Sequence, residues 1–215
     1  MIDDQGAVTE EDDDDDASPV PGRSYDDDCR IAIHESGHVI AALLLGEPVG
    51  FVTVNPADGY EGCVRGAWGI RAFVKEGGKP VDASELRKVL APTMPRPGED
   101  RAKVSDVFSS VHAKCIEYAA AKVAEKMLLD GEPSSAADDQ RQARELAALI
   151  CSSEKAVDSF LNYCEIAAHD LLSPHAMLIW SFSIPRLLRQ DQSARSLIFL
   201  PGPNTCRARL AAFPM

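Results

Sequence analysis

The chain has 215 residues, of which 45% are hydrophobic, and its formal net charge is −12. This length suits one domain with a real hydrophobic core, flanked by tails. The charge is unevenly placed, because residues 1–28 hold 12 acidic residues against Arg23 alone and leave the rest nearly neutral. Such an acidic segment cannot bury apolar surface, so residues 1–27 are expected to form a disordered tail. The sequence has no basic patch, so we expect no nucleic-acid partner.

Cysteine use and hydropathy exclude further classes of protein. The six cysteines are scattered and form no CxxC pair, which argues against a zinc ribbon or a redox motif. The N-terminus is acidic, so no secretory signal peptide is expected, and the longest apolar run, 39–45, is too short to cross a membrane. These features predict a soluble cytoplasmic protein with reduced thiols and no membrane partner.

The first predicted element is a helix over 31–45 that is apolar on nearly every side and therefore buried. The three aspartates 26–28 are expected before its first turn, and Gly46 is expected to end it as a C-cap. Gly37 lies inside the helix, where glycine costs about 1 kcal/mol relative to alanine. A glycine there indicates that the backbone of another element approaches closely.

Two segments rich in β-branched and aromatic residues, 49–54 and 62–68, are separated by a turn and predict a β-hairpin near this helix. Helical patterns dominate afterwards, over 84–90, 103–129, 136–151 and 154–172. The small residues 119–121 would allow the long helix to pack tightly. Ser173 and Pro174 restart the helix, Pro185 breaks or kinks it, and residues 191–215 are expected to form a poorly ordered tail. The fold class is mainly α (α+β), in one domain over 28–190 with a small β-hairpin.

A metal-binding motif lies inside the first helix. His34 and His38 are four residues apart, so their side chains project from one helix face and can share a metal ion. Glu35 stands beside them, where it could act as a general base on a metal-activated water, as in the HExxH zinc metalloproteases. The alternative is that both are ordinary core histidines bonded to carbonyl groups. Burying two histidines and a carboxylate is costly without a metal, and this favours one zinc ion.

A catalytic zinc site needs a third protein ligand. The extension HExxHxxGxxH is missing, since alanine and leucine occupy positions 41 and 44. Two adjacent aspartates then differ in helical phase. Asp139 shares a face with the apolar residues 143, 146, 147 and 150, whereas Asp138 shares one with mainly polar residues and could serve a capping box begun by Ser135. We expect Asp139 as the ligand; Asp138 and the histidines 112, 169 and 175 are the alternatives.

Four segments together resemble the peptidase domain of the FtsH family of ATP-dependent zinc proteases. They are 32–46 (AIHESGHVIAALLLG), 51–56 (FVTVNP), 119–131 (AAAKVAEKMLLDG) and 135–143 (SAADDQRQA). The resemblance implies a helical metallopeptidase domain and assigns the third zinc ligand to Asp139. Ser36 and Ser135 depart from the family's motifs, which have alanine and glycine there. The chain has no GxxxxGK[ST] loop, so the ATPase module of the family is missing.

These observations predict a zinc-dependent endopeptidase that cleaves unfolded or flexible protein segments, with one zinc per chain. His34, His38 and Asp139 would bind the metal, and Glu35 would be the catalytic base. The expected partners are a protein or peptide substrate and either a second copy of the chain or a separate ATPase. The main alternative is a catalytically weak, zinc-stabilised binding or adaptor module. A zinc hydrolase acting on a substrate other than peptides is the third hypothesis.

Overall fold

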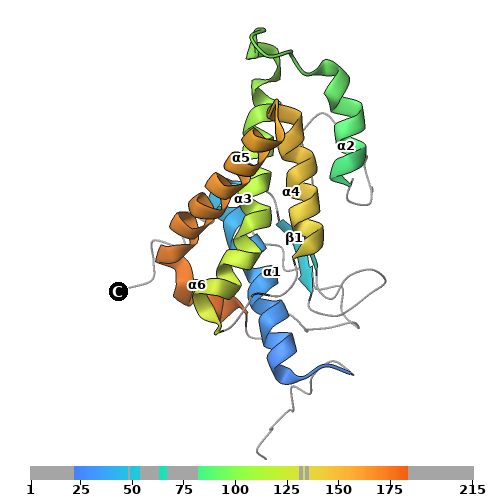
Figure 1. The fold of residues 1–215 in the computed structure, drawn as a ribbon. Coiled ribbons are helices and arrows are strands. Elements are labelled where there is room, and N and C mark those ends of the chain that lie inside the picture. Colours follow the sequence, from blue (N-terminus) through green and yellow to red (C-terminus); the bar gives the residue numbers. More distant parts are fainter. Residues whose placement is uncertain are drawn as a thin grey trace, which may run out of the picture.

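Helices make up most of the described chain, as the sequence predicts (Figure 1). The computed structural model describes residues 22–47, 49–53, 63–66, 82–130, 133 and 136–183. The predicted tail at 191–215, most of the predicted acidic tail and Pro185 lie outside these residues. None of the described helices is long and apolar enough to cross a lipid bilayer.

Helix α1 spans Tyr25–Leu45 and begins earlier than predicted. Ser24 caps it, because its hydroxyl accepts from the Asp27 backbone N–H while the Asp27 carboxylate accepts from the Ser24 backbone N–H. The prediction that the three aspartates precede the first turn is therefore wrong. The acids lie within the first turn, where the helix dipole favours negative charge. Gly46 ends the helix with a φ of 77°, as predicted.

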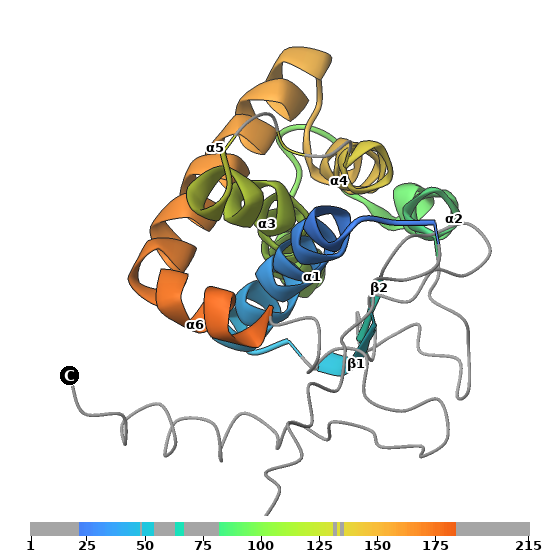
Figure 2. The ribbon, with the colours of Figure 1, turned by 90° about the horizontal axis from the view of Figure 1, so that it is seen from below.

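Helix α3 (Ser105–Leu128) lies against α1, and the two form the centre of the molecule (Figure 2). Gly37 makes this close packing possible. A Cβ atom at Gly37 would lie 2.8 Å from the carbonyl oxygen of Ala120 and 2.8 Å from the Cβ of Ala124. The expectation of a close backbone neighbour at Gly37 is confirmed, and the neighbour is the small-residue stretch of α3.

The other helices surround this central pair. They are α2 (Ala83–Leu90), α4 (Ala137–Ile150), α5 (Glu154–Leu172) and α6 (Ala176–Phe182), and 3-10 turns precede α3 and α6. α4 and α5 pack on α3, α2 packs on α4, and α6 lies against α1. The helix predicted over 154–172 is confirmed at both ends, and those predicted over 84–90 and 136–151 are each within one residue of the observed ends. The largest fully buried apolar side chains are Ile33, Leu146, Leu172 and Ile179.

Two short strands lie beside α1. Strand β1 (Val49–Thr53) pairs antiparallel with β2 (Cys63–Gly66), with Val52 opposite Val64, and the register shifts between Val49 and Phe51. β1 follows α1 shortly after Gly46 and packs against it. The predicted turn between the strands lies outside the described residues, so the hairpin connection stays a prediction.

Candidate metal centre

Three side chains from two helices converge at one point. His34 and His38 project from one face of α1, and Asp139 comes from the first turn of α4. The Oδ2 atom of Asp139 lies 3.2 Å from Nε2 of His34 and 3.3 Å from Nε2 of His38. One potential ligand atom from each of the three residues lies within 4.8 Å of the other two, so a single ion could contact all three. The structure thus brings together the three residues that the sequence singles out as metal ligands.

In each of the two imidazoles, the nitrogen that points away from Asp139 has a hydrogen-bond partner in the protein. His34 Nδ1 lies 2.7 Å from Oε1 of Glu125, and His38 Nδ1 lies 2.9 Å from the backbone carbonyl oxygen of Glu117. Both acceptors require a proton on Nδ1, so in the neutral imidazoles each Nε2 carries a lone pair. These lone pairs face the Asp139 carboxylate, which is also an acceptor. The three groups therefore need a cation between them, either protons or a metal ion.

The pKa values of the three side chains also show that the centre favours positive charge. Burial opposes protonation of His34, but the hydrogen-bonded carboxylates of Asp139 and Glu125 outweigh it and raise the pKa of His34 to about 10. Burial likewise opposes protonation of His38, and the charge of Asp139 outweighs it and raises the pKa of His38. Burial alone would raise the pKa of Asp139, but the two histidines hold it well below its usual range. A metal-free centre therefore holds protons that a metal ion would displace.

Glu35 is buried beside the two histidines, with 6% of its surface exposed. Its negative charge adds to the groups that raise the pKa of both imidazoles, which places it within electrostatic reach of the centre. A buried carboxylate next to a cation site is suited to accept and return a proton. This environment is compatible with the role that the sequence predicts for Glu35.

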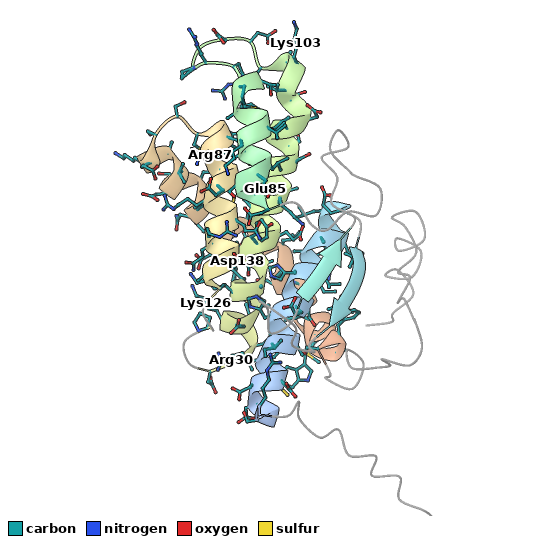
Figure 3. All side chains as sticks on the ribbon, turned by 90° about the vertical axis from the view of Figure 1, so that its right-hand side faces the viewer. Arg30, Glu85, Arg87, Lys103, Lys126 and Asp138 are labelled. Atoms are coloured by element: carbon teal, nitrogen blue, oxygen red, sulfur yellow. The ribbon has the colours of Figure 1, made fainter. Side chains whose placement is uncertain are left out.

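The two adjacent aspartates of α4 have opposite surroundings. Asp139 points into the centre with its side chain 19% exposed, whereas the side chain of Asp138 is 69% exposed and lies on the outside of α4 (Figure 3). Asp138 accepts hydrogen bonds from Arg141 and Gln142. The N-cap of α4 is Ala136, one residue later than predicted, and it makes no side-chain cap bond; Ser135 of the predicted capping box lies outside the described residues.

The alternative histidine ligands lie elsewhere. His112 stacks on the ring of Tyr163, with centroids 5.6 Å apart, and its Nε2 lies 3.3 Å from the tyrosine hydroxyl. His169 lies near the exposed C-terminal end of α5, beside Asp170 and Ser173. Neither these residues nor His175 joins the cluster of His34, His38 and Asp139.

Glu125 is a residue of the centre that the sequence analysis does not identify. It is 1% exposed on α3, and its second carboxylate oxygen lies 3.3 Å from Nη1 of Arg30. A signal for it does exist, because Glu125 follows the buried Ala121 by four residues and so lies on the buried face of α3. Helical periodicity, which selects Asp139 on α4, therefore also places Glu125 on the buried face of α3.

Tyr118 is a second such residue. Its ring stands edge-on to His38, with the ring centroids 6.5 Å apart, and its hydroxyl lies 3.3 Å from Oε1 of Gln142. Burial raises the pKa of Tyr118 well above its usual range, so the phenol stays protonated and neutral. Tyr118 is therefore a neutral aromatic neighbour of His38.

Comparison with known proteins adds no relatives, since neither a protein-family model nor a curated protein matches this sequence. We therefore infer the function from the geometry of the centre and from the resemblance of the four sequence segments.

Proposed function

We propose that this protein is a zinc-dependent endopeptidase. The observation that carries the proposal is the convergence of two histidine nitrogens and one carboxylate oxygen, with a buried glutamate next to the first histidine. Two nitrogens and one oxygen form a ligand set that zinc accepts in hydrolases, and it leaves a coordination position free. The neutral imidazoles and the carboxylate fit this ion because their lone pairs face one another with no donor between them.

The residues would divide the work as follows. His34, His38 and Asp139 hold the ion, which supplies Lewis-acid polarisation of a water molecule and of the peptide carbonyl. Glu35 takes a proton from the attacking water and passes it to the nitrogen of the departing amine. Glu125 and the Glu117 carbonyl keep the proton of each imidazole on Nδ1, so that both Nε2 atoms remain available as ligands.

The resemblance of four segments to the FtsH peptidase domain supports the same proposal. Because the chain carries no ATP-binding loop, its substrates would be unfolded segments, flexible termini or short peptides that reach the centre unaided. A separate ATPase would be the partner that delivers folded proteins, and a second copy of the chain would form a homo-oligomer. The thiols of Cys29, Cys115, Cys151 and Cys164 are free, which supports a cytoplasmic location.

The test combines metal analysis with digestion of unfolded casein. Zinc-loaded wild-type protein should cleave casein, and Glu35→Gln should keep its zinc and its circular dichroism spectrum but lose turnover, because an amide cannot accept the proton of water. If the wild-type protein binds zinc but cleaves nothing, the proposal of an enzyme would give way to that of an adaptor module. Bound iron in place of zinc would also reject the proposal, since two histidines and a carboxylate can hold that metal.

A further inference from the structure

One face of α1 carries three basic or titratable side chains at successive turns. Arg30, His34 and His38 are each four residues apart, so they form one stripe along the helix. The neighbouring face of α3 carries Glu117 and Glu125. His34 contacts the carboxylate of Glu125, and His38 contacts the carbonyl of Glu117. Arg30 extends the stripe by one turn toward the start of α1 and lies outside the set of metal ligands (Figure 3).

Arg30 and His34 share the carboxylate of Glu125, with one oxygen each. The Oε2 atom lies 3.3 Å from Nη1 of Arg30, and the Oε1 atom lies 2.7 Å from Nδ1 of His34. Both donors come from α1, and the acceptor comes from α3. Contacts on both oxygens fix the orientation of the carboxylate better than either contact does alone.

The charges at Glu125 give Arg30 a role that His34 cannot take over. Glu125 is 1% exposed, and a buried carboxylate is costly unless nearby groups compensate its charge. When a metal ion occupies Nε2 of His34, the imidazole is neutral and offers Glu125 a hydrogen bond without a charge of its own. Arginine keeps its positive charge in proteins. Arg30 therefore supplies a permanent positive charge beside this carboxylate.

This ion pair connects the buried centre with the surface. The side chain of Arg30 is 31% exposed, and that of Glu125 is 0% exposed. A pair with one partly exposed member contributes little to stability by itself. Its effect on the centre is different in kind, because a movement of Glu125 also moves the imidazole of His34 that is bonded to it.

We infer that Arg30 is a positioning residue of the metal centre, which holds Glu125 in the orientation that directs Nε2 of His34 at the ion. The inference rests on the metal site of the proposed function, but it does not depend on peptide hydrolysis. Zinc affinity measures the effect in the metal-bound protein. Solvent exchange of the Nδ1 proton of His34 measures it in the metal-free protein.

The experiment compares substitutions that remove or keep the charge of Arg30. Arg30→Met and Arg30→Gln should weaken zinc binding about tenfold, at the lower end of the range for outer partners of a metal ligand. Arg30→Lys should retain most of the affinity, because an ammonium group can also make a contact with one carboxylate oxygen. If only the packing of the aliphatic stem mattered, Arg30→Met and Arg30→Lys would behave alike. Equal zinc affinities of these two variants would overturn the inference.

Arg87→Met is the matched control. Arg87 also pairs with a glutamate of another helix, Glu145 at 2.8 Å, but neither residue belongs to the metal cluster. This variant should bind zinc as the wild type does.

A double-mutant cycle tests whether Arg30 acts through Glu125. In Glu125→Gln protein, Arg30→Met should cause little further loss of zinc affinity, because the carboxylate that carries its effect is already gone. A further loss of about tenfold in that background, equal to the loss expected in the wild type, would overturn the inference.

Metal-free protein provides a measurement that does not need zinc. In NMR spectra of protein with labelled histidine, the Nδ1 proton of His34 should exchange with water faster in Arg30→Gln than in wild type or Arg30→Lys. If wild-type protein binds no zinc but shows this difference, the proposed function fails and the role of Arg30 stands. If zinc binds and casein is cleaved, but neither zinc affinity nor exchange rate depends on Arg30, the inference fails and the proposed function stands.

Discussion

The Nδ1 atom of His34 lies 2.7 Å from the Oε1 atom of Glu125, a fully buried residue from a different helix. A carboxylate in this position orients the imidazole and makes its other nitrogen a stronger ligand. Glu125→Gln should therefore weaken zinc binding about 10–100-fold while the amide oxygen still accepts the Nδ1 proton. Competition with a chromophoric chelator measures the affinity.

Glu154 provides the control for this substitution, because its side chain is 84% exposed on α5, and Glu154→Gln should bind zinc as the wild type does. Wild-type zinc affinity in Glu125→Gln would mean that the hydrogen bond alone, without the negative charge, positions His34.

The adjacent aspartates of α4 allow the sharpest comparison. Asp139→Asn should lose most of the zinc, because the substitution removes the negative charge that faces both Nε2 atoms. Asp138→Asn should keep it, since Asp138 is exposed and bonded only within α4. Zinc content after dialysis against a weak chelator separates the two variants. Retention of zinc in Asp139→Asn would show that Asp139 is not the third ligand, and the histidines 112, 169 and 175 would be substituted next.

Gly37→Ala tests the contact between α1 and α3. Helix propensity alone favours alanine by about 1 kcal/mol. The added methyl group would nevertheless lie 2.8 Å from the Ala120 carbonyl oxygen, so α1 and α3 must separate, and overpacking of this kind costs about 1–3 kcal/mol. We expect a lower Tm and, because α3 carries Glu125 and α1 carries both histidines, weaker zinc binding. An increase in Tm would show that the helices adjust without strain.

Zinc should reverse the pH dependence of stability. In the chelator-treated protein the pKa of His34 is raised to about 10, above its unfolded value near 6.5. Its contribution is therefore fully present below pH ~6.5 and is lost as the pH rises toward 10, at up to about 1.4 kcal/mol per pH unit for one proton. With zinc in excess, the ligands must be deprotonated, so stability should rise with pH over the lower part of this range.

Urea unfolding between pH 6 and 9, with and without zinc, measures both slopes. Parallel slopes would argue against a shared site for protons and metal.

The elements with strong local patterns were predictable from the sequence. The helix Glu154–Leu172 has a stripe of apolar residues and a serine cap, and both its ends agree with the prediction. The phase of Asp139 on α4 was predictable for the same reason, because helical periodicity places its neighbours on a known face.

Interactions between distant residues were not predictable from local patterns. Asp28 looks like part of a solvated acidic run, yet it is fully buried in the first turn of α1, and its Oδ1 atom lies 3.7 Å from Nη1 of Arg23. Helical phase could place Glu125 on the buried face of α3, but no local pattern indicates that it contacts His34, which is 91 residues away. Charged residues in a core are explained by their partners, and those partners become visible only in the folded chain.

The separation of Asp139 from the histidines of α1 has a consequence for the lifetime of the protein. An ion held by these residues would link two helices that are separated by about half of the chain. It could bind all three ligands only after α4 has docked on α3. Binding to the native state alone stabilises that state by mass action, so the folded fraction would follow the free zinc concentration. Where zinc is scarce, more of the protein would open and be degraded by other proteases, and its abundance would follow the supply of the metal.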